Sequence, residues 1–166
     1  MSADLIDTLL GLAAPAALYE VRHARDKVVA ATQGSHELFF ARDLPGNLTL
    51  VERLAVALYA ASLTPQAALA EHYLQQLQAE GAAPDVLELI QADAIDGLGD
   101  QRLRSILGFT RTLILAPVEG DRAALKQLQD AGLATTEIVV LAQLIAYLSY
   151  QVRLFAGLGA LQGATP

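Results

Sequence analysis

The segment LTLVERLAVALYAASL, residues 48–63, decides the fold. It opens with a capping-box pattern, TLVE, in which Thr49 caps a helix and Glu52 reaches back to the Thr49 backbone N–H. Residues 54–63 are then apolar almost all round the helix, which is typical of a helix buried on most of its surface. The segment therefore predicts a central helix inside a folded core.

Downstream of this segment, helix start and stop signals are dense and the alternating pattern of strands is nearly absent. Thr64, Asp100 and Asp121 are suited to cap helices, whereas Gly81 and Gly132 are suited to end them. The helices expected here cover approximately residues 65–80, 84–92, 101–115, 122–131 and 135–158. The pattern indicates an all-α fold.

Upstream of it, a first helix is expected over about residues 3–12 and a second over about residues 15–32, with a proline in its first turn. Gln33 and Gly34 are expected to interrupt the second helix. A short third segment over residues 35–40 would follow, with a serine as its cap.

The composition predicts a single domain that self-associates. The chain has 166 residues, about one domain's worth, of which 54% are hydrophobic and only 17% are charged. Because so little polar surface is available, part of the apolar excess is expected in subunit contacts, and we expect a homo-oligomer, a dimer or larger. The net charge of −7 and the scattered Lys and Arg residues argue against nucleic acid as a partner.

Several classes of function are excluded or disfavoured by what the sequence lacks. The chain has no cysteine, which excludes disulfides, thiolate metal sites and cysteine nucleophiles. His23, His36 and His72 are dispersed and form no recognisable metal-binding set, and no cofactor is expected. The N-terminus has no basic region before its apolar part, so we expect a cytoplasmic protein. Residues 138–152 are apolar but shorter than the roughly 20 residues that span a bilayer, so no membrane is expected as a partner.

One internal similarity occurs, at an offset of 51 residues, between QLQAEGAAPDVLELI (76–90) and QLQDAGLATTEIVVL (127–141). Five residues recur at matching places, among them the glycines Gly81 and Gly132. Two interpretations stay open: a duplicated helical unit, or two similar helix-glycine-helix corners that share common capping chemistry.

The stretch GDRAALKQLQDAGLATTEIVVLAQLIAYLSYQVRLFAGLGAL, residues 120–161, resembles the last two helices of alkylhydroperoxidase D-like and peroxidase-related proteins. Those proteins have a Leu, three residues, Gly-Leu corner and then an apolar helix that ends in Arg. These places are held here by Leu128, Gly132, Leu133 and Arg153. Residues 48–63 resemble the core helix of the same superfamily, which includes carboxymuconolactone decarboxylases, and Glu52 matches its Glu. The resemblance is strongest over about residues 35–160 and implies one all-α domain over residues 1–166.

Residues 62–77, SLTPQAALAEHYLQQL, stand where the superfamily has a CxxC pair and, four residues after its second Cys, a His. If His72 is that His, the two cysteine positions hold Pro65 and Ala68. If the spacing from the core-helix Glu is kept instead, both positions move one residue earlier and Glu71 takes the place of the His. Neither alignment contains a thiol.

In the thiol members, the resemblance implies, the Glu and His relay a proton to the cysteine that attacks peroxide. Without a thiol that relay has nothing to activate, so thiol peroxidase activity is excluded. If Glu52 and His72 face one pocket, they can still act as acid and base, and they are the catalytic candidates. Tyr73 and Arg153 are the substrate-binding candidates, Arg153 because it could bind a carboxylate.

Each candidate also has a structural interpretation. Glu52 fits the capping box, and His72 is an ordinary half-buried histidine. Tyr73 would be a core residue whose OH bonds a backbone carbonyl, and Arg153 would form an ion pair.

Three functions therefore stay open. The first is a Cys-free relative that binds a small anionic metabolite or acts on it by acid-base chemistry of the decarboxylase or lyase type. The second is a non-catalytic helical protein that serves oligomerisation or partner binding. The third is a protein that is peroxidase-related by homology alone.

Overall fold

The computed structural model describes residues 3–163. Within this range the chain is all-α, as expected, and contains no strand. Its α-helices are α1 (Leu5–Leu10), α2 (Ala17–His23), α3 (Asp26–Phe39), α4 (Leu50–Leu63), α5 (Ala67–Ala79), α6 (Pro84–Gln91), α7 (Gln101–Leu115), α8 (Arg122–Asp130) and α9 (Thr135–Gly163). Two 3-10 helices, η1 (Ile95–Gly97) and η2 (Pro117–Glu119), flank α7.

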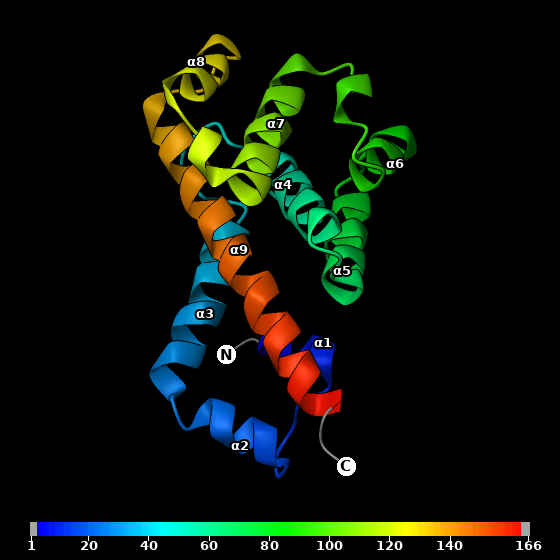
Figure 1. Ribbon diagram of the computed structural model, residues 1–166, viewed down its shortest axis with the longest axis vertical. Helices are drawn as coiled ribbons and strands as arrows, with labels where there is room; N and C mark the ends of the chain where they lie inside the picture. Colours follow the sequence, from blue (N-terminus) through cyan, green and yellow to red (C-terminus); the bar gives the residue numbers. More distant parts are fainter. Residues whose placement is uncertain (1–2, 164–166) are drawn as a thin grey trace.

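Helix α4 is the centre of the molecule, as its sequence predicts. The Thr49 hydroxyl accepts a hydrogen bond from the Glu52 backbone N–H, and the Glu52 carboxylate accepts one from the Thr49 N–H, so the predicted capping box is confirmed. All residues of α4 from 53 to 61 are buried. A helix with no solvent-facing side needs partners all round it, and α5, α6, α7 and α9 pack against α4 (Figure 1).

Helix α9 has 29 residues and joins the two halves of the molecule, running from beside α8 to beside α1 and α2 (Figure 1). It extends five residues beyond the expected end at residue 158. By length and composition it could cross a membrane, yet half of its most apolar window is buried inside the molecule. Such burial is typical of the core helix of a soluble protein, because those side chains already have apolar neighbours.

The N-terminal helices α1, α2 and α3 form an arm beside the second half of α9 (Figure 1). Here the expected bounds are wrong in two places. The helix expected over residues 15–32 is broken at Ala24 and Arg25, and α3 runs through Gln33 and Gly34 without a break. The Ser35 hydroxyl bonds the carbonyl of the preceding turn of α3 and caps nothing. One glycine costs a helix only about 1 kcal/mol, which the rest of α3 tolerates.

Ion pairs between α2 and the start of α1 explain why α2 ends where it does. The Arg22 guanidinium bonds Asp4 at 3.0 Å and Asp7 at 2.6 Å, and His23 Nε2 lies 2.7 Å from the other Asp7 oxygen. These contacts hold the last turn of α2 against α1, whereas α3 leaves in a new direction. The sequence carries no local signal for them, since the partners lie 15 to 18 residues apart.

The two similar corners of the sequence have the same backbone. Gly81 (φ 82°) and Gly132 (φ 87°) both take the left-handed conformation just after a helix, and both corners have the same pair of closing hydrogen bonds. The helices that follow differ, since α6 has 8 residues and α9 has 29. Shared capping chemistry therefore accounts for the corners, and the duplication of a larger unit stays a prediction.

Candidate functional site

A groove of about 550 Å³ opens between α1, α3 and α5 and contains two histidines, His36 and His72. Its apolar wall comes from Leu5, Leu9 and Phe40. Its remaining lining residues are Ala3, Thr8, Gln33, Glu37 and Gln76. The volume lies within the range of small-molecule sites in proteins.

The helices bring the two imidazoles together from segments far apart in the chain. His36 lies on α3 and His72 on α5, and their ring centroids are 6.2 Å apart. Phe40, one helical turn after His36, lies 4.9 Å from its ring, and Tyr73 lies 5.1 Å from His72 in an edge-on arrangement. The rings therefore form one cluster in which each imidazole has an aromatic neighbour.

The buried Arg53 of α4 fixes the end of α3 that carries His36. Its guanidinium donates to the carbonyls of Phe39 and Ala41, and its Nε donates to that of Leu48 at 3.1 Å. These carbonyls lie at the end of α3 and in the loop that follows it. Carbonyl groups at a helix end have no partner within the helix, so Arg53 supplies one. Arg53 is 1% exposed, so the charge is satisfied by protein carbonyls in place of water.

Both imidazoles of the groove are neutral at pH 7. Burial, followed by the nearby His72, lowers the pKa of His36 to about 4, although Glu37 and Asp4 act in the opposite direction. Burial also lowers the pKa of His72. The Nδ1 atom of His36 is buried and has no hydrogen-bond partner among residues 3–163. A buried polar atom without a partner carries a desolvation cost, which a hydrogen-bonding group that reaches it would remove.

Tyr73 supports the cluster from the core side and does not line the groove. It is 1% exposed, and its OH donates to Gln151 Oε1 at 2.7 Å, while Gln151 Nε2 donates to the Tyr147 OH at 3.2 Å. Burial, with Tyr147 nearby, raises the pKa of Tyr73, and the bond to Gln151 opposes this only in part. Tyr73 is thus a core residue, but its partner is a side-chain amide from α9, where a backbone carbonyl was expected.

Glu52 lies away from the groove, in the first turn of α4. Besides closing the capping box, its carboxylate accepts a hydrogen bond of 2.6 Å from Arg102 Nε. Arg102 also donates to the carbonyls of Gly132 and Asn47. The structure therefore does not bring Glu52 and His72 into one pocket, as acid-base chemistry between them would need, and Glu52 ties the starts of α4 and α7 to the corner before α9.

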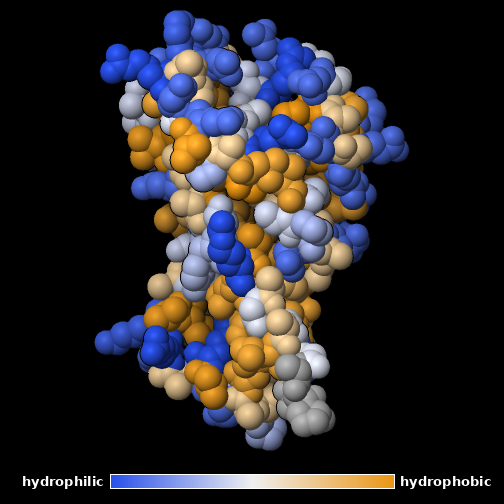
Figure 2. Space-filling view, viewed as in Figure 1, coloured by the Kyte–Doolittle hydropathy of each residue, from blue (hydrophilic) through white to orange (hydrophobic). Residues whose placement is uncertain are grey.

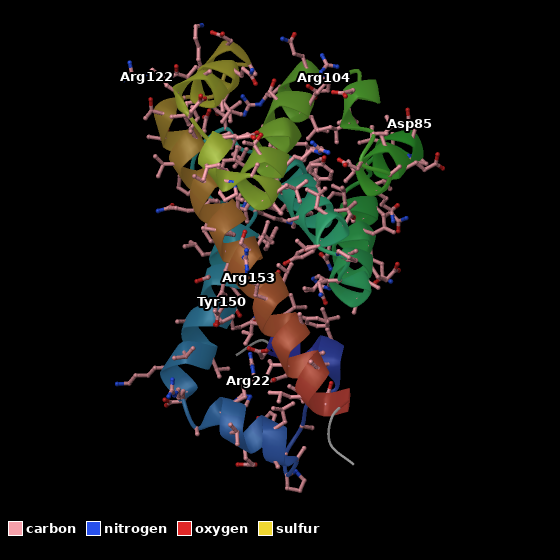
Figure 3. The ribbon with its side chains drawn as sticks, in the orientation of Figure 1. Arg22, Asp85, Arg104, Arg122, Tyr150 and Arg153 are labelled. Carbon is pink, nitrogen blue, oxygen red and sulfur yellow. The ribbon has the colours of Figure 1, made fainter. Side chains whose placement is uncertain are left out.

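Arg153 also lies apart from the groove, on the exposed side of α9 (Figure 3). Its guanidinium donates to the Ser149 carbonyl one turn earlier, at 2.6 Å. Over the described part of the chain it forms no ion pair, so the expected ionic partner is not found there. Of the four candidate residues, only His72 faces the groove.

The second histidine of the groove, His36, was not among the candidates. A usable signal is present in the sequence, because His36 and Phe40 stand four residues apart and share a helix face within the segment expected over residues 35–40. The sequence gives no sign that this face lies opposite His72. Across residues 3–163, no group of three or more His, Asp or Glu side chains is arranged to hold a metal ion.

Solved structures of two other proteins have a similar fold. A peroxidase-related protein from Silicibacter sp. TM1040 superimposes with a TM-score of 0.73 at 16% identity, over 80% of this chain and 69% of that one. A second, described as an alkylhydroperoxidase AhpD core and peroxidase-related protein from Ralstonia eutropha JMP134, gives a TM-score of 0.71 at 18% identity, over 82% and 71% of the two chains. The chain has the AhpD-like fold.

Both structural neighbours are described as uncharacterized, and at this identity the likeness concerns the fold alone. No family model matches the sequence, and no curated protein matches it either. The fold implied by the resemblance in residues 48–63 and 120–161 is thus confirmed. An AhpD-like fold without cysteine leaves the groove's own side chains as the only guide to function.

Proposed function

We propose that this AhpD-like protein binds a small, neutral, partly apolar molecule in the groove that His36 and His72 line. The main support is the pair of imidazoles that line the groove, and the buried Nδ1 atom of His36, which has no partner among residues 3–163, would be satisfied by a ligand polar group that reaches it. Neutral imidazoles offer one donor and one acceptor each, and Leu5, Leu9 and Phe40 offer apolar contact. This combination suits a ligand that carries hydroxyl or amide groups on a hydrocarbon frame.

Charge argues against the anionic metabolite that the sequence favoured. The residues that line the groove include no Lys or Arg, whereas Glu37 lines it and Asp4 lies near His36. An anion would meet two neutral imidazoles and the carboxylate of Glu37, with no Lys or Arg among the lining residues to pair with it. A neutral ligand avoids both penalties.

Binding is favoured over catalysis because the imidazoles are weak bases. A general base works best when its pKa lies near the working pH, and the pKa of His36 is about 4. Glu52 is committed to Arg102 and to the capping box, so it supplies no partner acid. Thiol peroxidase chemistry needs a cysteine that the chain lacks.

The test is a thermal-shift screen of neutral small molecules against five proteins: wild type, His36→Leu, His72→Leu, Arg153→Ala and Glu52→Gln. Leucine keeps apolar volume in the groove and removes the ring nitrogens. We expect a hit that stabilises wild type and the last two variants, but neither histidine variant. If a ligand stabilises all five proteins equally, it binds elsewhere and the proposal fails.

A second candidate function, self-association, is favoured by apolar residues left on the surface. Val21, Val28 and Leu38 on α2 and α3 are 72%, 52% and 59% exposed. Apolar side chains gather around the arm on the face drawn in Figure 2. Large apolar patches on soluble proteins mark contact surfaces, so we propose a homo-oligomer in which the arm contributes to the interface. The two functions are compatible, because the groove lies on the arm's border with α5.

A further inference from the structure

A second cavity, of about 390 Å³, lies where the connection after α6 meets α7 and α8. Three polar side chains dominate it: Asp93, Asp96 and Arg111. Thr112, Gln127 and Phe109 also line the cavity. None of these residues belongs to the histidine groove.

Asp93, which lines this cavity, is hydrogen-bonded to a residue of the protein core. Tyr59, in the middle of α4, is fully buried, and its OH donates to Asp93 Oδ1. Asp93 is the one residue other than glycine with a positive φ in the described chain, at 55°. It stands just past α6, at a helix end where glycine is the usual residue for this conformation. Aspartate tolerates a positive φ better than most residues. At this position it also places a carboxylate where Tyr59 and Arg111 bond it.

Asp93 in turn holds Arg111 in a fixed orientation. Arg111 Nε lies 3.1 and 3.3 Å from the two carboxylate oxygens, and its Nη2 lies 3.2 Å from Oδ2. The bonds from Tyr59 and Arg111 lower the pKa of Asp93, and Asp93 raises that of Arg111, so both stay charged. A guanidinium has two edges that can take a carboxylate side-on, and Asp93 uses the Nε edge. The guanidinium also has an electrostatic and hydrogen-bonding contact with Tyr59, and within residues 3–163 the bonds found from its nitrogens to carboxylates come from Nε and Nη2, which leaves Nη1 available to a ligand.

The charges around the cavity define the class of ligand. Arg111 supplies one positive charge with a free edge, and Asp96 is exposed and has no hydrogen-bond or ionic partner in the described residues. A simple anion would meet two aspartates, and a simple cation would meet the arginine. A molecule with both charges satisfies both free groups at once.

We propose that this cavity binds a small zwitterion of the amino-acid type, whose carboxylate pairs with the free edge of Arg111 and whose ammonium group pairs with Asp96. Tyr59 and Asp93 act as positioning residues, since they orient Arg111 without contacting the ligand. The remaining space, beside Phe109, Thr112 and Gln127, takes the ligand's side chain. This site is independent of the neutral ligand proposed for the histidine groove.

The experiment uses the standard amino acids at millimolar concentration as probes, with amide chemical shifts of the ¹⁵N-labelled protein as the readout. For each amino acid, the carboxylic acid without the amino group and the amine without the carboxyl group are run beside it. We expect saturable shifts at Gly108 and Thr112 with at least one amino acid and none with either half-analogue. If no amino acid shifts these residues, or if the half-analogues bind equally well, the proposal is overturned.

Variants locate the binding. Arg111→Gln and Asp96→Asn each remove one charge from exposed positions and should weaken the bound amino acid by about tenfold, because each loses a charge-assisted hydrogen bond. Asp85→Asn is the matched control, an exposed carboxylate on α6 outside the cavity (Figure 3), and should leave affinity unchanged. Tyr59→Phe should weaken binding but keep the preference for zwitterions, as expected of a positioning residue. Equal affinity in wild type, Arg111→Gln and Asp96→Asn would contradict the assignment.

Discussion

Replacing His36 with leucine should remove a pH dependence of stability that the wild type shows between about pH 6.5 and 4. In the folded protein, burial and His72 hold the pKa of His36 at about 4, against its usual value of 6.5. The unfolded chain therefore binds more protons at this residue throughout that interval. By linkage, acidification favours the unfolded state, so the contribution of neutral His36 is present above pH 6.5 and is lost as the pH falls toward 4.

The size follows from the two pKa values. With values of about 4 and 6.5, the loss reaches about 2 kcal/mol at pH 5 and at most about 3 kcal/mol below pH 4. These are upper limits, since the groove is open to water, which relieves part of the desolvation. A domain of ordinary stability has roughly 5–15 kcal/mol in all, so the effect should be easy to measure.

The assay is urea unfolding of wild type and His36→Leu at closely spaced pH values. Carboxylates titrate in the same interval in both proteins, so the quantity of interest is the difference between the two unfolding free energies as a function of pH. That difference should change by about 2 kcal/mol between pH 7 and pH 5. Parallel curves for the two proteins, or an NMR titration that places the pKa of His36 near 6.5, would refute the inference that His36 is buried and neutral.

Three further predictions follow from the other sites. The protein should show no dithiol-dependent reduction of organic hydroperoxides above a heat-killed control, because no residue can form a sulfenic acid; real turnover would contradict this. Light scattering at micromolar concentration should show a dimer or larger species, and Val28→Asp should shift it toward monomer, whereas a wild-type monomer would count against self-association. Glu52→Gln should cost about 1–2 kcal/mol in urea unfolding through the weakened bond to Arg102, and Thr49→Ala about 1 kcal/mol through loss of the cap. Both variants should still bind ligand in the histidine groove. If Glu52→Gln alone lost binding, Glu52 would have to be part of the ligand site.

The parts of the fold that could be predicted are those with local causes. The capping box at Thr49, the all-round apolar helix after it and the glycine corners at Gly81 and Gly132 each depend on residues within one or two turns of each other. Such patterns can be recognised in a single sequence because neighbouring residues satisfy one another. The break between α2 and α3 depends instead on Arg22 reaching back to Asp4 and Asp7 in another helix.

The candidate site was harder to predict for the same reason. His72 was identified by its place after the core helix, but His36 lies 36 residues earlier in the chain, and only the fold brings their rings together. Glu52 looked like a candidate acid until Arg102, 50 residues later, proved to be its partner. The local sequence pattern correctly predicted the position of Glu52 in the first turn of α4, but it could not predict that Arg102 is its partner. Contacts between residues on different helices are therefore what local sequence patterns could not supply.

Glu52 also shows how this AhpD-like fold is stabilised at the start of α4 without any thiol. Its carboxylate accepts bonds from the Thr49 N–H and hydroxyl and from Arg102 Nε, so it joins the starts of α4 and α7. These contacts give Glu52 a structural role that needs no catalytic partner. At the positions that would hold the cysteines, Pro65, Ala67 and Ala68 offer no polar side chain, and Thr64 only donates its hydroxyl to the Ala60 carbonyl one turn earlier. The match at Glu52 thus agrees with the fold, and the two ligand sites that we propose use other side chains, those of His36 and Arg111.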